Sequence, residues 1–109
     1  MNLSIDVSRT DDIHHVKLSG EIDVYTAPKL KETILPLTKE EGVSIKVDLE
    51  KINYMDSTGL GVFISGLKSA KENHSELILM NLHERVYRLF DITGLKEVFK
   101  IENTVRGGK

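Results

Sequence analysis

The sequence of 109 residues contains no cysteine, no tryptophan and only two prolines. The absence of cysteine excludes disulfides, thiolate catalysis and zinc sites built on cysteine. No stretch approaches the roughly 18 consecutive apolar residues of a membrane-spanning helix. The N-terminus MNLSIDVSRTDD also lacks the basic start and the apolar run of a signal peptide. We therefore expect a cytoplasmic protein that does not contact the membrane.

The sequence also lacks a large excess of either positive or negative charge. Fifteen basic residues stand against seventeen acidic ones, which gives a formal net charge of −2. Direct nucleic-acid binding usually needs a basic patch or stripe, so this balance argues against it. Apolar residues make up 39% of the chain and aromatic residues only 6%, which predicts a mainly aliphatic core. The length suits a single domain over residues 1–109, ordered from about residue 3 to about residue 102, with a frayed tail TVRGGK.

Apolar and polar residues alternate over residues 3–7, 13–18 and 43–49, and ELILM at 76–80 is a short apolar run. These patterns predict strands, and the polar break at residues 8–12 predicts an antiparallel hairpin that ends at Gly20. Helical spacing predicts one helix from Thr26 to about Pro36, a second over residues 57–70, and a third that contains Leu82 and ends before Gly94. A short final strand is expected near residues 98–101.

The resulting order, β-β-α-β-α-β-α and a final strand, is typical of an α/β protein. We expect a single small mixed β-sheet, with an N-terminal antiparallel hairpin followed by parallel β-α-β units, covered by α-helices. Loops that follow parallel strands emerge at one edge of the sheet, where α/β proteins tend to place their sites. The loops at residues 20–25 and 52–57 should therefore meet, with Asp23 near Asp56 and Ser57.

The segment YMDSTGLGVF, residues 54–63, combines a helix start with residues that weaken a helix. Asp56, Ser57 and Thr58 are all suited to cap a helix N-terminus, and capping is the simplest explanation of the three. Gly59 and Gly61 follow at once, and each costs a helix about 1 kcal/mol relative to alanine. They either pack tightly on the sheet or leave a bare surface that another backbone can approach.

Motifs of known catalytic chemistry do not fit this segment. Neither Ser57 nor Ser65 lies in a Gly-x-Ser-x-Gly element, and Leu67 stands where a phosphate-binding loop requires lysine. His14 and His15 are adjacent in a predicted strand and point to opposite faces, so they cannot share a metal ion. The sequence thus predicts no catalytic residue and no metal site.

Ser57 has the surroundings of a phosphate acceptor. A phosphoserine carries about −1.5 to −2 charges at neutral pH. At a helix N-terminus this charge meets a favourable dipole and free N–H donors, so modification should leave the fold intact. Phosphorylation would place a dianion on a glycine-lined surface. That surface could bind a partner when Ser57 is unmodified and reject the same partner when Ser57 is phosphorylated.

Three blocks, GEIDVYTAPKLKE, YMDSTGLGVF and RLFDITGL, together resemble the STAS-domain anti-sigma factor antagonists of Gram-positive bacteria. The resemblance spans essentially the whole chain and favours the general stress, sigma-B branch over the sporulation branch. It implies that the unphosphorylated protein binds an anti-sigma factor that is also a serine kinase, and so releases the sigma factor. The kinase would phosphorylate Ser57, with Thr58 as the minor alternative, and a PP2C-type serine phosphatase would restore the bare form. No cofactor and no enzymatic activity are implied.

The residues assigned to partner binding or its support are Asp23, Asp56, Thr58, Gly59, Gly61, Val62 and Ser65. Two alternatives place other functions at the same rim. One is a STAS module that binds a small ligand or a nucleotide, against which the lack of a basic phosphate clamp in residues 20–26 and 52–61 argues. The other is a weak hydrolase that uses Ser57, for which neither loop supplies a histidine.

Overall fold

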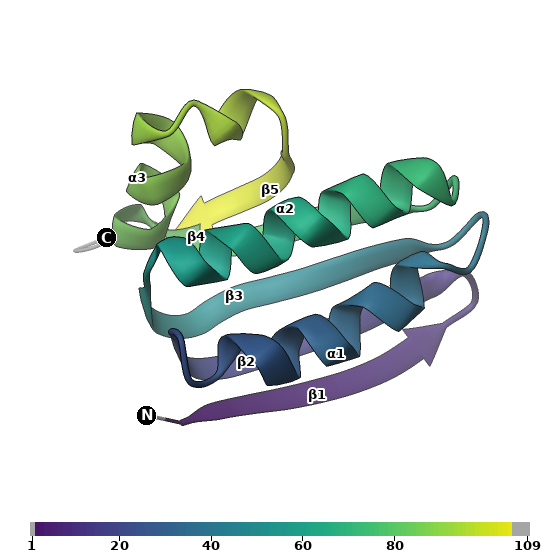
Figure 1. Cartoon of the computed structure of the whole chain (residues 1–109), viewed down its shortest axis with the longest axis horizontal. Coiled ribbons are helices and arrows are strands. Elements are labelled where there is room, and N and C mark those ends of the chain that lie inside the picture. Colours follow the sequence, from purple (N-terminus) through teal and green to yellow (C-terminus); the bar gives the residue numbers. More distant parts are fainter. Residues whose placement is uncertain (1, 106–109) are drawn as a thin grey trace.

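A single five-stranded sheet forms the centre of the computed structural model, which describes residues 2–105 (Figure 1). Strands β1 (Leu3–Thr10) and β2 (Ile13–Ile22) form an antiparallel hairpin around a two-residue turn. Strands β3 (Ser44–Met55), β4 (Glu76–His83) and β5 (Lys100–Val105) follow in sequence order, each parallel to its neighbour. The predicted mixed sheet is confirmed.

Helices α1 (Ala27–Thr38) and α2 (Ser57–Glu72) lie side by side across one face of the sheet (Figure 1). Helix α3 (Glu84–Ile92) follows β4, and a 3-10 turn (Leu95–Glu97) leads into β5. The opposite face of the sheet carries polar side chains, including an ion pair of 3.7 Å between Lys46 and Glu102. Within residues 2–105, no helix combines the length and apolar character needed to cross a membrane.

The core lies between the sheet and the helices and is mainly aliphatic, as expected. Leu30 and Ile34 of α1 and Val47 of β3 are completely buried, together with the two phenylalanines Phe63 and Phe90. Phe90 contacts Phe99 edge-on, with ring centroids 5.3 Å apart. These contacts hold the helices over the sheet.

Several predicted boundaries are corrected. β3 extends to Met55 rather than ending near residue 49, because its pairing with β2 continues to Met55. The alternating pattern did not mark this part of the strand, since two consecutive exposed residues lie on each side of Ile52. β2 continues past Gly20 to Ile22; at Gly20 the backbone has φ of +117°, and a Cβ would lie 2.2 Å from the Asn2 carbonyl oxygen. Leu82 belongs to β4 and not to the third helix.

At the C-terminal end, β5 includes residues 104 and 105, which were expected to belong to a frayed tail. The remaining tail residues, 106–109, lie outside the described part of the chain. Gly94 has φ of +76° just after the α3 C-cap, as expected of a residue that ends a helix. Pro36 lies inside α1, which ends two residues later at Thr38.

Candidate functional site

The two predicted loops meet at one edge of the sheet. Ile22 and Met55 are partners in the parallel register of β2 and β3, and they are the last residues of their strands. Asp23 and Asp56 come next in the chain, and the Asp56 N–H donates a hydrogen bond of 3.3 Å to the Ile22 carbonyl. The predicted juxtaposition of the two loops is therefore confirmed by the strand register.

Asp56, rather than Ser57 or Thr58, caps helix α2. Its Oδ1 accepts hydrogen bonds from the N–H groups of Thr58 (2.9 Å) and Gly59 (3.4 Å). Ser57 is the first residue of the helix, and its side chain is exposed. No hydrogen bond occupies the Ser57 hydroxyl within residues 2–105, and the exposed position of the residue leaves this hydroxyl accessible.

The glycines of α2 divide into two groups. A Cβ on Gly59 would lie 2.5 Å from Met55 Cγ and 2.8 Å from Ile22 Cγ2, so Gly59 is a packing residue between helix and sheet. A Cβ on Gly66 would come within 3.2 Å of Leu77. Gly61 is exposed, and a Cβ there would meet nothing within 4 Å. Of the three glycines, only Gly61 contributes to a bare surface.

The far part of the expected bare side also faces inward. The Ser69 hydroxyl lies 2.6 Å from the Thr38 hydroxyl and so joins α2 to α1. Ser65 is half-buried and Val62 is buried. The surface that is bare of side chains is therefore confined to the first turns of α2, because the small residues Gly66 and Ser69 further along face the sheet and α1.

Asp23 is buried and organises the loop between β2 and α1. Its Oδ1 accepts hydrogen bonds from the N–H groups of Tyr25 (2.9 Å) and Thr26 (3.0 Å). The Thr26 hydroxyl accepts from the Asp23 N–H (2.9 Å) and donates to the Glu21 carbonyl (3.0 Å). Thr26 precedes α1 but makes no capping bond to it. The other oxygen of Asp23, Oδ2, is buried and has no hydrogen-bond partner in the described residues.

This turn exposes two neighbouring side chains, those of Val24 and Tyr25, to which no role was assigned from the sequence. Val24 is 58% exposed and Tyr25 is 81% exposed. Val24 also lines an open cleft of about 490 Å³ between α1 and the start of α2, together with Ala27, Pro28, Lys31, Thr58, Gly61 and Val62. An apolar pair inside a polar loop, VY between Asp23 and Thr26, is the sequence signal that could have identified this surface.

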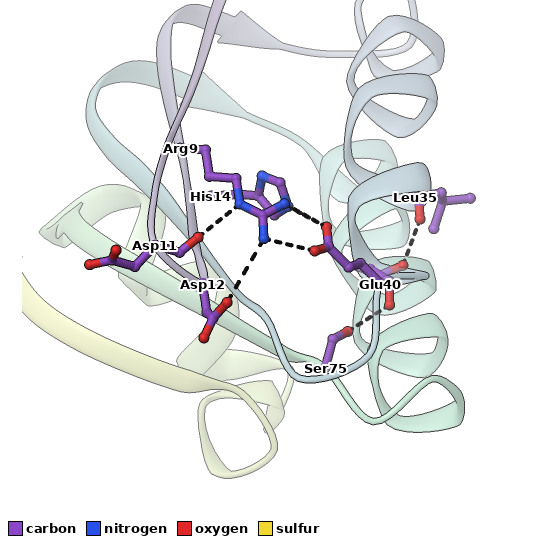
Figure 2. Close-up of polar contacts among 8 residues, drawn as sticks. Arg9, Asp11, Asp12, His14, Leu35, Glu40 and Ser75 are labelled. Atoms are coloured by element: carbon purple, nitrogen blue, oxygen red, sulfur yellow. Dashed lines mark hydrogen bonds and ion pairs between the residues drawn. The ribbon is translucent and has the colours of Figure 1, made fainter.

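A separate polar cluster lies at the other end of β2 (Figure 2). Both carboxylate oxygens of Glu40 contact the Arg9 guanidinium, Oε1 at 2.9 Å from Nη1 and Oε2 at 2.8 Å from Nη2. Glu40 Oε1 also lies 3.1 Å from His14 Nε2. The hydrogen bonds from Arg9 and then from His14 lower the pKa of the Glu40 carboxyl, and Glu40 in turn raises the pKa of Arg9. His14 is buried, while His15 points to the other face of the sheet and is half-buried. No cluster within residues 2–105 has the composition of a metal site.

Comparison with known proteins identifies relatives over nearly the full length. The STAS domain family matches residues 4–108. The anti-sigma-B factor antagonist of Listeria monocytogenes is 46% identical over 104 residues, which cover 94% of this chain and 91% of the relative. The anti-sigma-B factor antagonist of Bacillus subtilis is 46% identical over 108 residues, covering 99% and 98% of the two chains.

Solved structures share the fold at lower identity. A putative anti-sigma factor antagonist from Thermotoga maritima matches with a TM-score of 0.81 at 23% identity, covering 93% of this chain and 87% of the other. The anti-sigma factor antagonist SpoIIAA in its unphosphorylated form matches with a TM-score of 0.78 at 20% identity, covering 94% and 89%. Its phosphorylated form matches with a TM-score of 0.73 at 19% identity, covering 94% and 92%.

Proposed function

This chain belongs to the STAS-domain family, and from that premise we propose that it is an anti-sigma factor antagonist of the sigma-B type. The observation that carries the proposal is the 46% identity to anti-sigma-B factor antagonists over nearly the whole length of both chains. The protein acts by binding an anti-sigma factor, so that the sigma factor is released. It is a regulator rather than a catalyst, and it works in the cytoplasm.

Ser57 is the residue that switches binding off when it is phosphorylated. Its hydroxyl is exposed at the first position of α2 and makes no hydrogen bond in the described residues, because Asp56 already caps the helix. The N-terminus of a helix stabilises a nearby negative charge. Phosphorylation is therefore compatible with the fold, and Thr58 is the minor alternative acceptor.

The surface around Ser57 binds the anti-sigma factor. Gly61 leaves the second turn of α2 open, Val24 lines the same cleft as Gly61, and Val24 and its neighbour Tyr25 are both exposed anchors for a partner. Aromatic residues at the centre of an interface commonly supply much of its binding energy. A phosphate on Ser57 would add about two negative charges to this surface, and it would have to be desolvated for the same partner to bind.

Two enzymes complete the cycle. The anti-sigma factor is itself the serine kinase and uses ATP to modify Ser57, and a PP2C-type serine phosphatase removes the phosphate. Asp23 and Asp56 support the site, Asp23 by holding the Val24–Tyr25 turn and Asp56 by holding the start of α2.

Incubation with the anti-sigma factor of the same host, with and without ATP, tests the proposal. Without ATP the two proteins should co-elute in size-exclusion chromatography. With ATP the intact mass should rise by one phosphate, which peptide mapping should place on Ser57. A phosphate mapped to Ser65 or Ser69, or a Ser57→Ala protein that is still fully modified, would contradict the assignment.

A further inference from the structure

The start of α2 has a second open flank, on the side away from α1. β3 and β4 are paired only through residues 44–48 and 76–80, after which the two strands separate. Side chains bridge the gap: Asn81 Nδ2 donates to Asp48 Oδ1 (3.0 Å), and the His83 ring hydrogen-bonds to the Glu50 carbonyl. In Figure 1, the start of α2 lies between α1 and α3.

Two adjoining depressions follow this gap, with volumes of about 390 and 260 Å³, and both are lined by Arg85 and Val86. We call them together the β3–α3 groove. Its β3 side carries Lys51, Asn53 and Tyr54, and its α3 side carries Arg85, Arg88 and Ile92. The depression nearer to Ser57 along the chain contains Tyr54 and Met55, so the groove extends to within two residues of the proposed phosphate acceptor.

The chemistry of this nearer depression is apolar and cationic. Tyr54 is 45% exposed and Ile92 is 73% exposed. Arg85 and Arg88 are exposed, and within residues 2–105 neither forms an ion pair, whereas Lys96 on the following turn is paired with Asp91 at 3.1 Å. Acidic side chains, Glu50 and Glu84, line only the farther depression. The groove is therefore complementary to a segment that carries both acidic and apolar residues.

The backbone of β3 offers a further means of recognition. The last part of β3, with a bulge at Asn53, pairs with β2 on one side, but no strand of the described residues pairs with residues 51–55 on the side of the groove. A strand edge of this kind presents N–H and C=O groups that an extended peptide can use. The groove thus combines a strand edge, two apolar side chains and two free guanidinium groups.

We propose that the β3–α3 groove docks an acidic, partly apolar segment of the phosphatase that acts on Ser57, which rests on the proposed function above. The phosphate must repel one partner while the other still binds the phosphorylated form. The two partners therefore need contacts that differ. The cleft beside Gly61 on the α1 flank belongs to the anti-sigma factor, and the opposite flank remains available to the phosphatase.

The test uses full-length phosphoprotein, prepared with the kinase, and the PP2C-type phosphatase purified from the host by its activity on that phosphoprotein. The charge-reversal variant Arg85→Glu/Arg88→Glu should lower kcat/KM for dephosphorylation by about tenfold or more, through a higher KM at unchanged kcat. Arg85→Lys/Arg88→Lys should stay within about threefold of wild type, since it retains both charges. Affinity of the unphosphorylated variants for the anti-sigma factor should be unchanged.

Lys68→Glu/Lys71→Glu is the matched control, because these two exposed lysines have the same spacing on α2 and also lack ion pairs within the described residues. A broad-specificity acid phosphatase should act on all the phosphoproteins alike. The proposal is wrong if charge reversal at Arg85 and Arg88 leaves kcat/KM for dephosphorylation unchanged, or lowers it no more than the lysine control does. It is also wrong if the reversal weakens binding of the anti-sigma factor by the same factor. If the reversal variant does not fold by circular dichroism, Arg85→Gln/Arg88→Gln replaces it.

Wild-type protein alone tests the proposed function, before any variant is compared. If the kinase does not modify the wild-type protein, or if no host phosphatase removes its phosphate, the proposed function itself is wrong.

Discussion

Asp23 and Asp56 follow directly after Ile22 and Met55, the last residues that β2 and β3 hold in register. Asp23 is 5% exposed and its Oδ1 binds the N–H groups of its own turn. Asp56 instead accepts from the first N–H groups of α2. Each carboxylate thus fixes one side of the same rim, and the Ser57 hydroxyl between these loops is left accessible.

The assignment of the α2 cap to Asp56 leads to a prediction about stability. Ser57→Ala should change the free energy of unfolding by less than about 0.5 kcal/mol, as for an ordinary surface substitution. Asp56→Ala should cost about 1 kcal/mol, because it removes the cap. Urea denaturation of the two variants measures this difference. If Ser57→Ala destabilised the protein as much as Asp56→Ala, the serine would be a structural cap and not a free acceptor.

The two glycines at the start of α2 should respond in opposite ways to the same substitution. Gly61→Val introduces a side chain into open space, so it should weaken binding of the anti-sigma factor with little change in stability. Gly59→Val must displace Met55 and Ile22 and should cost about 1–3 kcal/mol, as overpacking typically does. Titration binding and thermal melting of both variants test the pair. A Gly61→Val protein with full affinity would show that the partner does not approach this turn.

Asp23→Asn tests whether the buried carboxylate does more than hold its turn. Asparagine retains the Oδ1 acceptor of the Tyr25 and Thr26 N–H groups, so the melting temperature should change little. Removal of the charge beside the rim should slow phosphorylation of Ser57 or weaken binding of the anti-sigma factor. Asp23→Ala, which loses the turn itself, should be destabilised by about 1–3 kcal/mol. Should Asp23→Asn match wild type in both phosphorylation and binding, Asp23 is only a turn residue.

The ion pairs of Glu40 predict a dependence of stability on pH. Arg9 and His14 lower the pKa of the Glu40 carboxyl in the folded protein. A lowered carboxyl pKa stabilises the folded state above the ordinary glutamate pKa, and this contribution is lost as the pH falls through the folded value. The stability difference between wild type and Glu40→Gln should therefore be constant near neutral pH and vanish in acid.

Denaturation midpoints from pH 7 to pH 3 measure that difference, with Glu41→Gln as the control, since Glu41 is an exposed neighbour with no ion pair in the described residues. A wild-type advantage over Glu40→Gln that persisted undiminished at pH 3 would contradict the assigned pKa direction.

Much of the fold and the shared rim followed from the sequence because alternating and helical patterns mark the buried faces. The strand order and the register then brought Asp23 beside Asp56. The roles of the α2 glycines were not predictable, since tight packing and exposure differ only in what surrounds the backbone: Gly59 faces Met55, and Gly61 faces solvent.

Other features depended on tertiary contacts that leave no local pattern. After Asp48, β3 pairs with β2 alone, and its separation from β4 opens the β3–α3 groove. The exposure of Tyr25 depends on the inward turn of Asp23, which a short loop sequence does not specify. In both cases apolar side chains face outward: Tyr25 in the loop, and Tyr54 and Ile92 in the groove.

One phosphate on Ser57 should be enough to control binding of the anti-sigma factor. Isothermal titration of that factor with unphosphorylated protein and with protein fully phosphorylated at Ser57, both checked by circular dichroism, tests it most directly. The unphosphorylated form should bind at least about a hundredfold more tightly, a difference of ~2.7 kcal/mol, while both forms remain equally folded. Equal affinity of the two folded forms would contradict the claim.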